Sequence, residues 1–219
     1  MACKNLFCLL VLIVVCKCLH AQVPVYEEPL HKVVLKNEYI RLIDVHLPPG
    51  DTTQFHIHAA TSVFIHFTTS MIGGQVMGEA FSQPGIVEAG YTRYTDYARQ
   101  PLTHRVYSAD KNDFHVMDIE LMKKMPTTDS CADLLTQPGI ETTINEKLVR
   151  MYKFNVESQG SLNVPESGCA HLLACITGEV NAGGKKINAG GYLFINANMA
   201  IHISNPSGNK AGCVLVELK

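Results

Sequence analysis

The sequence contains no tryptophan, and only 17% of its 219 residues are charged. The 18 basic residues are outnumbered by 20 acidic ones, and they form no basic cluster, so neither a nucleic-acid partner nor a polybasic membrane anchor is predicted. The chain has no glycine-rich phosphate loop, no Gly-x-Ser-x-Gly motif and no pair of carboxylates in a recognisable frame. These absences leave nucleotide binding and nucleophilic hydrolysis without support.

The one long apolar run lies near the start of the chain. Lys4 precedes the apolar residues 6–15, and the small Ala21 offers a cleavage point before Gln22. This pattern predicts a secretory signal peptide over residues 1–21, because the apolar run is too short to span a bilayer. We expect a mature chain that starts near Gln22, is exported from a bacterial cell to the periplasm and has no membrane partner. A retained N-terminal anchor is the alternative.

The rest of the sequence predicts an all-β protein. Short runs of β-branched and aromatic residues alternate with Gly, Pro, Asn and Asp turns, and no helical period is sustained. Residues 123–137 differ, because they are polar and bounded by prolines. We therefore predict a β domain over residues 22–122, a linker over 123–137 and a second β domain over 138–219.

The two predicted domains look like copies of one another. Asn-Glu followed by a strand arginine occurs at 37–41 and again at 145–150. Apolar strands that end in Glu-Leu occur at 116–121 and at 213–218. Each half also has a histidine in its penultimate strand, His104 and His202. The order and spacing of these matches predict an internal duplication.

The stretch 48–58 places two histidines after a turn. Proline, glycine and aspartate at 48–51 are typical of turns, and the following residues predict a strand. In an extended strand Gln54, His56 and His58 would share one face. His104 supplies a third histidine well downstream. Two imidazoles side by side on one strand, with a third from another strand, can bind one metal ion.

His56, His58 and His104 are therefore the predicted metal ligands. Three neutral imidazoles suit divalent Fe, Mn, Ni, Cu or Zn, and a metal with three protein ligands keeps open positions for substrate. The alternative is that the three are ordinary polar groups facing a barrel interior. Gln54 and His66 are predicted accessory residues, because both can face the same interior, although a solvated rim residue and a hydrogen-bonded core histidine are the competing interpretations.

These motifs resemble those of the cupin superfamily, and the duplication resembles a bicupin. Gly50, His56 and His58 match the opening of the first cupin motif, and His104 matches the histidine of the second. The resemblance covers nearly all of the predicted mature chain. It implies two tandem jelly-roll β-barrels with a metal site in the first.

Several positions depart from the cupin pattern. The glutamate that completes the metal site should fall at Ser62 or Val63, which cannot replace it, so we expect no carboxylate in the metal shell. In the second half the ligand histidines fall at Pro165 and Ser167, and His171 takes the glutamate position. The second barrel is therefore predicted to be a degenerate copy whose metal site has decayed.

The resemblance implies a metal-dependent enzyme that acts on a small molecule, of the dioxygenase type. The competing class is a non-catalytic bicupin that binds a small molecule or a partner without metal, because one fold hosts both. Either is compatible with a homodimer. Residues around the second motif would favour an anionic or aromatic ligand at the barrel mouth, or would pack between the barrels: Tyr91, Tyr94, Tyr97, Tyr107, Arg93, Arg99 and Arg105.

Four cysteines lie beyond the predicted signal peptide: Cys131, Cys169, Cys175 and Cys213. The last three lie in apolar, strand-like runs, which favours buried cysteines that act as small hydrophobic residues. One disulfide is compatible with export, but its pairing cannot be read from the sequence.

Overall fold

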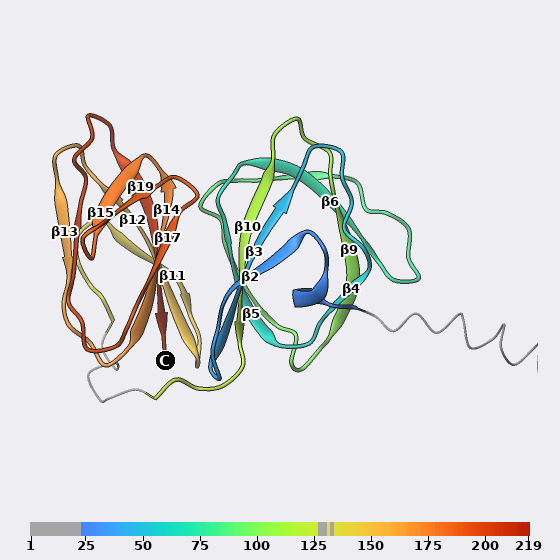
Figure 1. Cartoon of the computed structure of the whole chain (residues 1–219), viewed down its shortest axis with the longest axis horizontal. Helices are drawn as coiled ribbons and strands as arrows, with labels where there is room; N and C mark the ends of the chain where they lie inside the picture. Colours follow the sequence, from blue (N-terminus) through green and yellow to red (C-terminus); the bar gives the residue numbers. More distant parts are fainter. Residues whose placement is uncertain (1–22, 127–130, 132–133) are drawn as a thin grey trace, which may run out of the picture.

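The computed structural model describes residues 23–126, 131 and 134–219. The predicted signal peptide, the start at Gln22 and part of the predicted linker lie outside these residues. The regular secondary structure of the described chain is almost entirely β, which confirms the predicted fold class, and its strands form two barrels that lie side by side (Figure 1). No helix in these ranges is long and apolar enough to cross a membrane.

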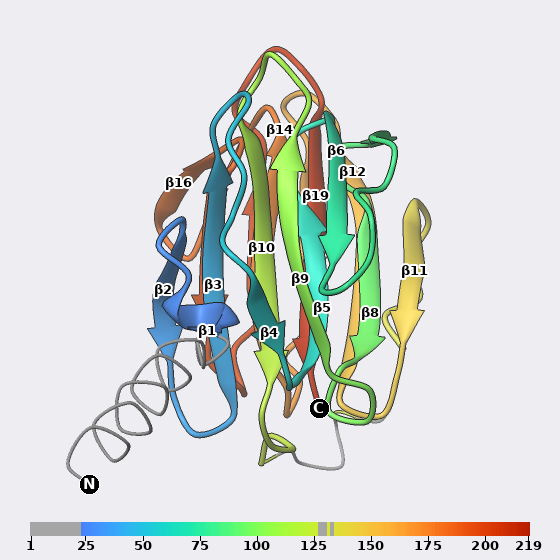
Figure 2. The same ribbon diagram turned by 90° about the vertical axis from the view of Figure 1, so that its right-hand side faces the viewer.

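The first barrel consists of two five-stranded sheets, with strand orders β1-β4-β9-β6-β7 and β2-β3-β10-β5-β8. Its strands are β1 (Val23–Pro24), β2 (His31–Lys36), β3 (Ile40–Leu47), β4 (His56–His58), β5 (Thr61–His66), β6 (Ser70–Val76), β7 (Gly85–Val87), β8 (Thr92–Asp96), β9 (Leu102–Ser108) and β10 (Phe114–Leu121), and the 3-10 turn η1 (Val25–Glu27) follows β1. The sheet with β4, β9 and β6 lies on the side away from the second barrel (Figure 2).

The second barrel repeats this arrangement, without a counterpart of β1, in a five-stranded sheet of order β11-β12-β19-β14-β17 and a four-stranded sheet of order β13-β18-β15-β16. Its strands are β11 (Ile140–Asn145), β12 (Val149–Val156), β13 (Ser161–Val164), β14 (Ala170–Thr177), β15 (Glu179–Ala182), β16 (Lys185–Asn188), β17 (Tyr192–Ile195), β18 (Ile201–Ser204) and β19 (Ala211–Leu218).

The strand register supports the internal duplication. In the first barrel Glu120 on β10 lies opposite Arg41 on β3, and the two side chains form an ion pair of 2.5 Å. In the second barrel Glu217 on β19 lies opposite Arg150 on β12, also with an ion pair of 2.5 Å. A register shift interrupts the pairing of β2 with β3 and of β11 with β12 at the same distance from each arginine. Counting from these ion pairs assigns equivalent positions in the two barrels.

The barrels pack through the outer faces of two sheets. Alternate residues of β10, including Met117 and Ile119, point out of the first barrel, and Met151 and Val216 point out of the second. All four are fully buried in one apolar cluster that contains residues from both barrels. Because a strand alternates its faces, these two sheets are buried on both sides. Burial on both sides explains why β14 and β19 carry apolar residues at adjacent positions and not only at alternate ones.

The interior of the second barrel is filled by side chains. Tyr152, Leu173, Ile203 and Leu215, all with no exposed surface, belong to one apolar cluster inside it. Cys175 and Cys213 lie opposite one another on β14 and β19 and are free, which agrees with their interpretation as small hydrophobic residues.

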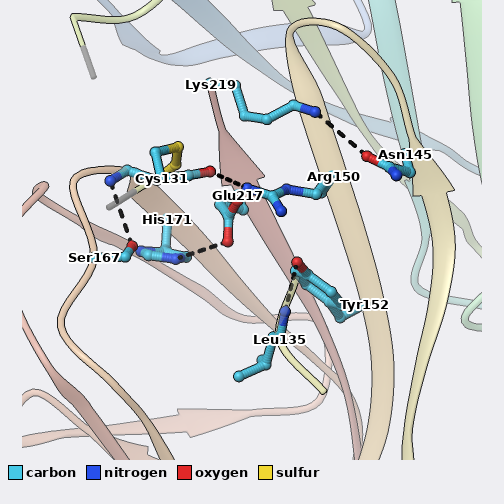
Figure 3. The surroundings of a disulfide bond; sticks show 10 residues. Cys131, Leu135, Asn145, Arg150, Tyr152, Ser167, His171, Glu217 and Lys219 are labelled. Carbon is cyan, nitrogen blue, oxygen red and sulfur yellow. Dashed lines mark hydrogen bonds and ion pairs between the residues drawn. A yellow bond between two sulfur atoms is a disulfide. The ribbon is translucent and has the colours of Figure 1, made fainter. Parts of the chain in front are cut away.

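A disulfide joins Cys131 to Cys169 at one end of the second barrel (Figure 3). The interpretation of Cys169 as a free hydrophobic residue is therefore wrong. The sequence held no signal for the pairing, because the two residues are 38 positions apart and the chain between them determines where they meet. The carbonyl oxygen of Cys131 accepts a hydrogen bond from the buried Arg150, so the bridge lies against the Arg150–Glu217 ion pair.

Candidate metal and ligand site

The three predicted ligand histidines come together inside the first barrel. His56 and His58 lie on β4, and His104 on β9 lies directly opposite His56 in the antiparallel pairing. The ring centroids are 5.1 Å apart for His56 and His58, 4.8 Å for His56 and His104, and 5.0 Å for His58 and His104. One nitrogen from each ring lies within 4.8 Å of the other two. This spacing brings three nitrogens to a common centre from two adjacent strands.

Main-chain contacts and burial prepare these rings to act as neutral ligands. The Nδ1 atom of His56 lies 2.9 Å from the carbonyl oxygen of Gln54, so its Nε2 atom is left to face the other rings. Burial and the neighbouring imidazoles lower the pKa of His56 to about 2. Burial, then His58 and Arg93, lower the pKa of His104 to about 3. The buried Nε2 atom of His104 has no hydrogen-bond partner within the described chain. Neutral rings with a free nitrogen are the state that binds a metal ion.

A carboxylate that the sequence analysis did not expect lies beside this cluster. Asp118 on β10 is 1% exposed, and its Oδ2 atom is 3.4 Å from Nδ1 of His58. Neither carboxylate oxygen has a hydrogen-bond partner in the described ranges. We expected no carboxylate at this site because Ser62 and Val63 cannot supply one. Asp118 comes instead from β10, which is distant in sequence. Asp118 lies outside the three-histidine group, beside one of its members. Asp118 is therefore placed to orient His58 rather than to act as a fourth ligand beside the three histidines.

His31 on β2 is a fourth histidine that the sequence analysis missed. Its ring centroid is 4.8 Å from that of His56, and its Nδ1 atom is 2.7 Å from the carbonyl oxygen of Val25. Its Nε2 atom is 3.6 Å from the buried carboxylate of Glu28. Burial lowers the pKa of His31, and the Glu28 charge opposes this shift. No motif in the sequence marks His31, because its place depends on how η1 folds against β4.

The two predicted accessory residues behave differently from one another. The alternation on which Gln54 was placed holds only within β4, which begins at His56, and the preceding residues are not in the strand ladder. As a result the Gln54 side chain is exposed, Thr53 lines the interior instead, and Gln54 serves the site through its carbonyl oxygen. His66 does face the interior, but its ring contacts Tyr91 and Phe114 and is not part of the three-histidine group.

A cavity of about 370 Å³ adjoins the histidines. His58, His104, Asp118 and Arg93 line it, together with mainly apolar residues: Val25, Val45, Phe64, Ile72, Ile86, Val87, Val106 and Val116. Its lining includes β7 and β8, which are the edge strands of the two sheets of this barrel. The cavity therefore connects the histidine cluster to the side of the barrel where the two sheets remain unpaired, and it has the size and polarity of a small-molecule site.

Two other groups of polar residues are less suited to hold a metal. Asp44, His46 and His115 lie on the outer face of the first barrel. There the Nε2 atom of His115 lies 2.7 Å from Oδ1 of Asp44, and the rings of His46 and His115 stack with their centroids 4.0 Å apart. In the second barrel His171 is buried, and its Nε2 atom lies 3.8 Å from Oε2 of Glu217. His202 is exposed, because Ile201 and Ile203 take the inward positions of β18. The second barrel thus has no counterpart of the three-histidine group among its described residues.

The sequence matches no family model and no curated protein. Its structure, however, is similar to that of several solved proteins. It matches AerE from Microcystis aeruginosa over 88% of this chain and 98% of that chain, with a TM-score of 0.60 and 10% identity. It matches the bacterial pirin YhhW from Escherichia coli, solved in complex with nickel(II), over 86% and 90% of the two chains, with a TM-score of 0.61 and 15% identity.

A protein named as a cupin and an oxalate decarboxylase also match. A cupin 2 conserved barrel domain protein from Leptotrichia buccalis has a TM-score of 0.54 and 11% identity over 86% of this chain and 88% of that chain. An oxalate decarboxylase has a TM-score of 0.55 and 10% identity over 86% of this chain and 72% of that chain. At these identities the likeness concerns the fold. The chain therefore has the fold of the cupin superfamily in its bicupin form, with two tandem jelly-roll barrels.

Proposed function

We propose that the first barrel is the functional half of this protein and that it binds a divalent metal ion through His56, His58 and His104, next to a small-molecule cavity. The observation that carries this proposal is the convergence of three nitrogens from two strands beside the cavity, which His58 and His104 line. Lowered pKa values keep His56 and His104 neutral near neutral pH, so the ion need not displace protons from these two rings. Among the structural neighbours, YhhW was solved with nickel(II) and the oxalate decarboxylase of Bacillus subtilis contains Mn(II) centres.

The residues present fit a metal with open coordination positions. Three imidazoles form the ligand set, and the Asp118 carboxylate beside His58 resembles the carboxylate that orients a ligand histidine in many metal sites. When bound, such an ion acts as a Lewis acid or a redox centre for a small molecule in the cavity. The chain itself contributes the apolar walls, which exclude water, and the charged groups, which orient the small molecule. We propose metal-dependent small-molecule chemistry of the dioxygenase type as the activity.

Metal analysis of the purified full chain tests the proposal. After exchange against Ni(II) or Mn(II) and removal of free ion, the unmodified protein should retain about one equivalent of metal, because all three ligands are preorganised. His58→Ala removes one of the three ligands and should reduce bound metal to a small fraction. The β fold should persist in this variant, because His58 is in neither the shared apolar layer nor the cluster inside the second barrel, and in the first barrel's own cluster its ring contacts only Phe64 and Tyr97.

His202→Ala is the matched control, since it removes an exposed histidine from the second barrel and should leave the metal content unchanged. Circular dichroism of both variants reports whether they fold. Metal retained by a folded His58→Ala variant would place the ion elsewhere. A folded, metal-free wild type that binds small molecules would instead favour the non-catalytic bicupin.

A further inference from the structure

Arg93 on β8 is a cation that the fold leaves without a carboxylate. Its guanidinium lies 4.7 Å above the centre of the Phe64 ring and donates a 3.2 Å hydrogen bond to the hydroxyl oxygen of Tyr97. No aspartate or glutamate in the described ranges forms an ion pair with it. Burial, followed by the Arg93 charge, lowers the pKa of His66 to about 4, so the field of this cation reaches into the cavity.

The fold also does not require a charged residue at position 93. On the adjacent strand Phe64 pairs with Arg93, and at the equivalent position of the second barrel Leu173 pairs with Leu193. Leu193 packs against the apolar interior of its barrel, so a leucine satisfies this strand position. The fold therefore does not require a charge here, and Arg93, an exposed residue on an edge strand, lines the cavity where a ligand can reach it.

The geometry points to a ligand site in which Arg93 anchors the carboxylate of an apolar monocarboxylic acid, such as an aromatic or branched-chain acid. A guanidinium presents a planar fork that matches a carboxylate with two parallel hydrogen bonds. The remaining wall of the cavity is mostly apolar, with side chains such as Ile72, Val106 and Val116 against which a hydrocarbon body would pack. A phosphate ester is disfavoured, because Arg93 is the only lysine or arginine that lines the described cavity.

The orientation of this ligand rests on the proposed metal site. Arg93 stands on β8, at an edge of the barrel, whereas His58 and His104 line the same cavity from β4 and β9. An acid held by Arg93 would therefore direct the rest of its body from the edge of the barrel toward the histidines. The Asp118 carboxylate would repel a second negative charge near His58, which favours a monocarboxylate over a dicarboxylate.

Calorimetric titration of the full chain with benzoate and 3-methylbutanoate, and with the corresponding neutral amides, tests this inference. Each titration is made on protein loaded with Ni(II) and on metal-free protein. We expect both acids to bind the loaded protein at least about tenfold more tightly than their amides, because the charged hydrogen bonds to Arg93 are lost with the amide. Arg93→Met should remove this preference while the metal content stays unchanged.

Arg99→Met is the matched control, because Arg99 lies outside this cavity and its loss removes the same charge from the protein. It should bind the acids as the wild type does. Equal binding of acid and amide, no binding of either acid at millimolar concentration, or an unchanged acid preference in Arg93→Met would each overturn the inference. Loss of metal from the wild type would instead count against the proposed metal site, and the metal-free titrations would still show whether Arg93 selects the carboxylate.

Discussion

Apart from β1, which has no counterpart, the two barrels have the same strand order, and they share the same Arg–Glu register, yet their interiors differ in kind. Counting from the two ion pairs, Asp118 on β10 occupies the position of Leu215 on β19. By the same count His66 corresponds to Cys175, and Arg93 corresponds to Leu193. Each of these polar groups of the first barrel is replaced in the second by a residue that packs in its apolar cluster. The polar groups of the first interior are therefore not needed to form a barrel of this type.

This difference shows how a duplicated fold can divide its tasks. A filled interior and a shared apolar layer between the barrels provide burial, which is the main favourable term in folding. The first barrel lines its interior with imidazoles and a carboxylate, which is costly unless these groups are hydrogen-bonded or bind a ligand. We infer that the second barrel and the shared layer offset this cost, so that the first barrel can keep a cavity.

The largest effect that we expect from a single substitution is the loss of stability when one of the two equivalent ion pairs is broken. Glu217→Gln removes the carboxylate that pairs with Arg150, which is 2% exposed, and breaking this buried ion pair should cost about 3–5 kcal/mol of the free energy of unfolding. Burial and then the nearby Asp118 charge raise the pKa of Glu120, so Glu120→Gln also relieves a repulsion and should cost about 1 kcal/mol less. Chemical denaturation of both variants measures the difference. A larger loss for Glu120→Gln would show that the two pairs are not comparable.

A second pair of variants tests the filled and the hollow interior directly. Val180 is fully buried in the apolar cluster of the second barrel, whereas Val106 lines the cavity of the first. Val180→Ala should cost about 2–3 kcal/mol, because lost burial and a new void add together. Val106→Ala enlarges an existing cavity and should cost about 1 kcal/mol or less. Thermal unfolding gives both values, and equal losses would argue that the first interior is as tightly packed as the second.

The third prediction concerns Asp118, whose place in the second barrel is taken by a leucine. Asp118→Asn keeps the size of the side chain but removes the charge beside His58, and should weaken metal affinity by about 10–100-fold. Asp113→Asn, which alters a carboxylate that contacts His46 outside the barrel, should leave the affinity unchanged. Competition with a chelator measures both. Equal affinity in the two variants would mean that Asp118 does not act through His58.

The last prediction is a pH dependence, small for each group, that should belong to the first barrel of the metal-free protein. Burial is the main cause that lowers the pKa of His56 to about 2, of His104 to about 3 and of His66 to about 4. In the unfolded chain these groups titrate near about 6.5, so the unfolded state binds more protons below that pH and the free energy of unfolding falls as the pH falls. Between about pH 7 and pH 5 the loss should be about 1–2 kcal/mol for each imidazole.

Thermal unfolding as a function of pH checks this trend. His66→Phe should flatten the profile in part, since it removes one buried imidazole from the interior and leaves the three predicted ligands in place. A profile that does not change between neutral and mildly acidic pH would contradict the expected burial of neutral imidazoles in the folded state.

The sequence by itself determined the features that depend on local pattern and on repetition. Alternating apolar residues and frequent turns predicted an all-β chain, and the matching Asn-Glu openings and Glu-Leu endings predicted the duplication that the Arg41–Glu120 and Arg150–Glu217 pairs display. The spacing of His56 and His58 on one strand predicted that they would share a face, because strand geometry has a period of two.

Only the tertiary structure decided which distant residues meet around that face. Asp118 and His31 reach the site from β10 and β2, and Cys131 reaches Cys169 from the segment between the barrels, all through chain folding that no local pattern encodes. The alternation that placed the Gln54 side chain failed because the chain before His56 leaves the strand ladder. Local periodicity fixes the direction of a side chain within a strand, whereas the pairing of strands far apart in sequence determines what it faces.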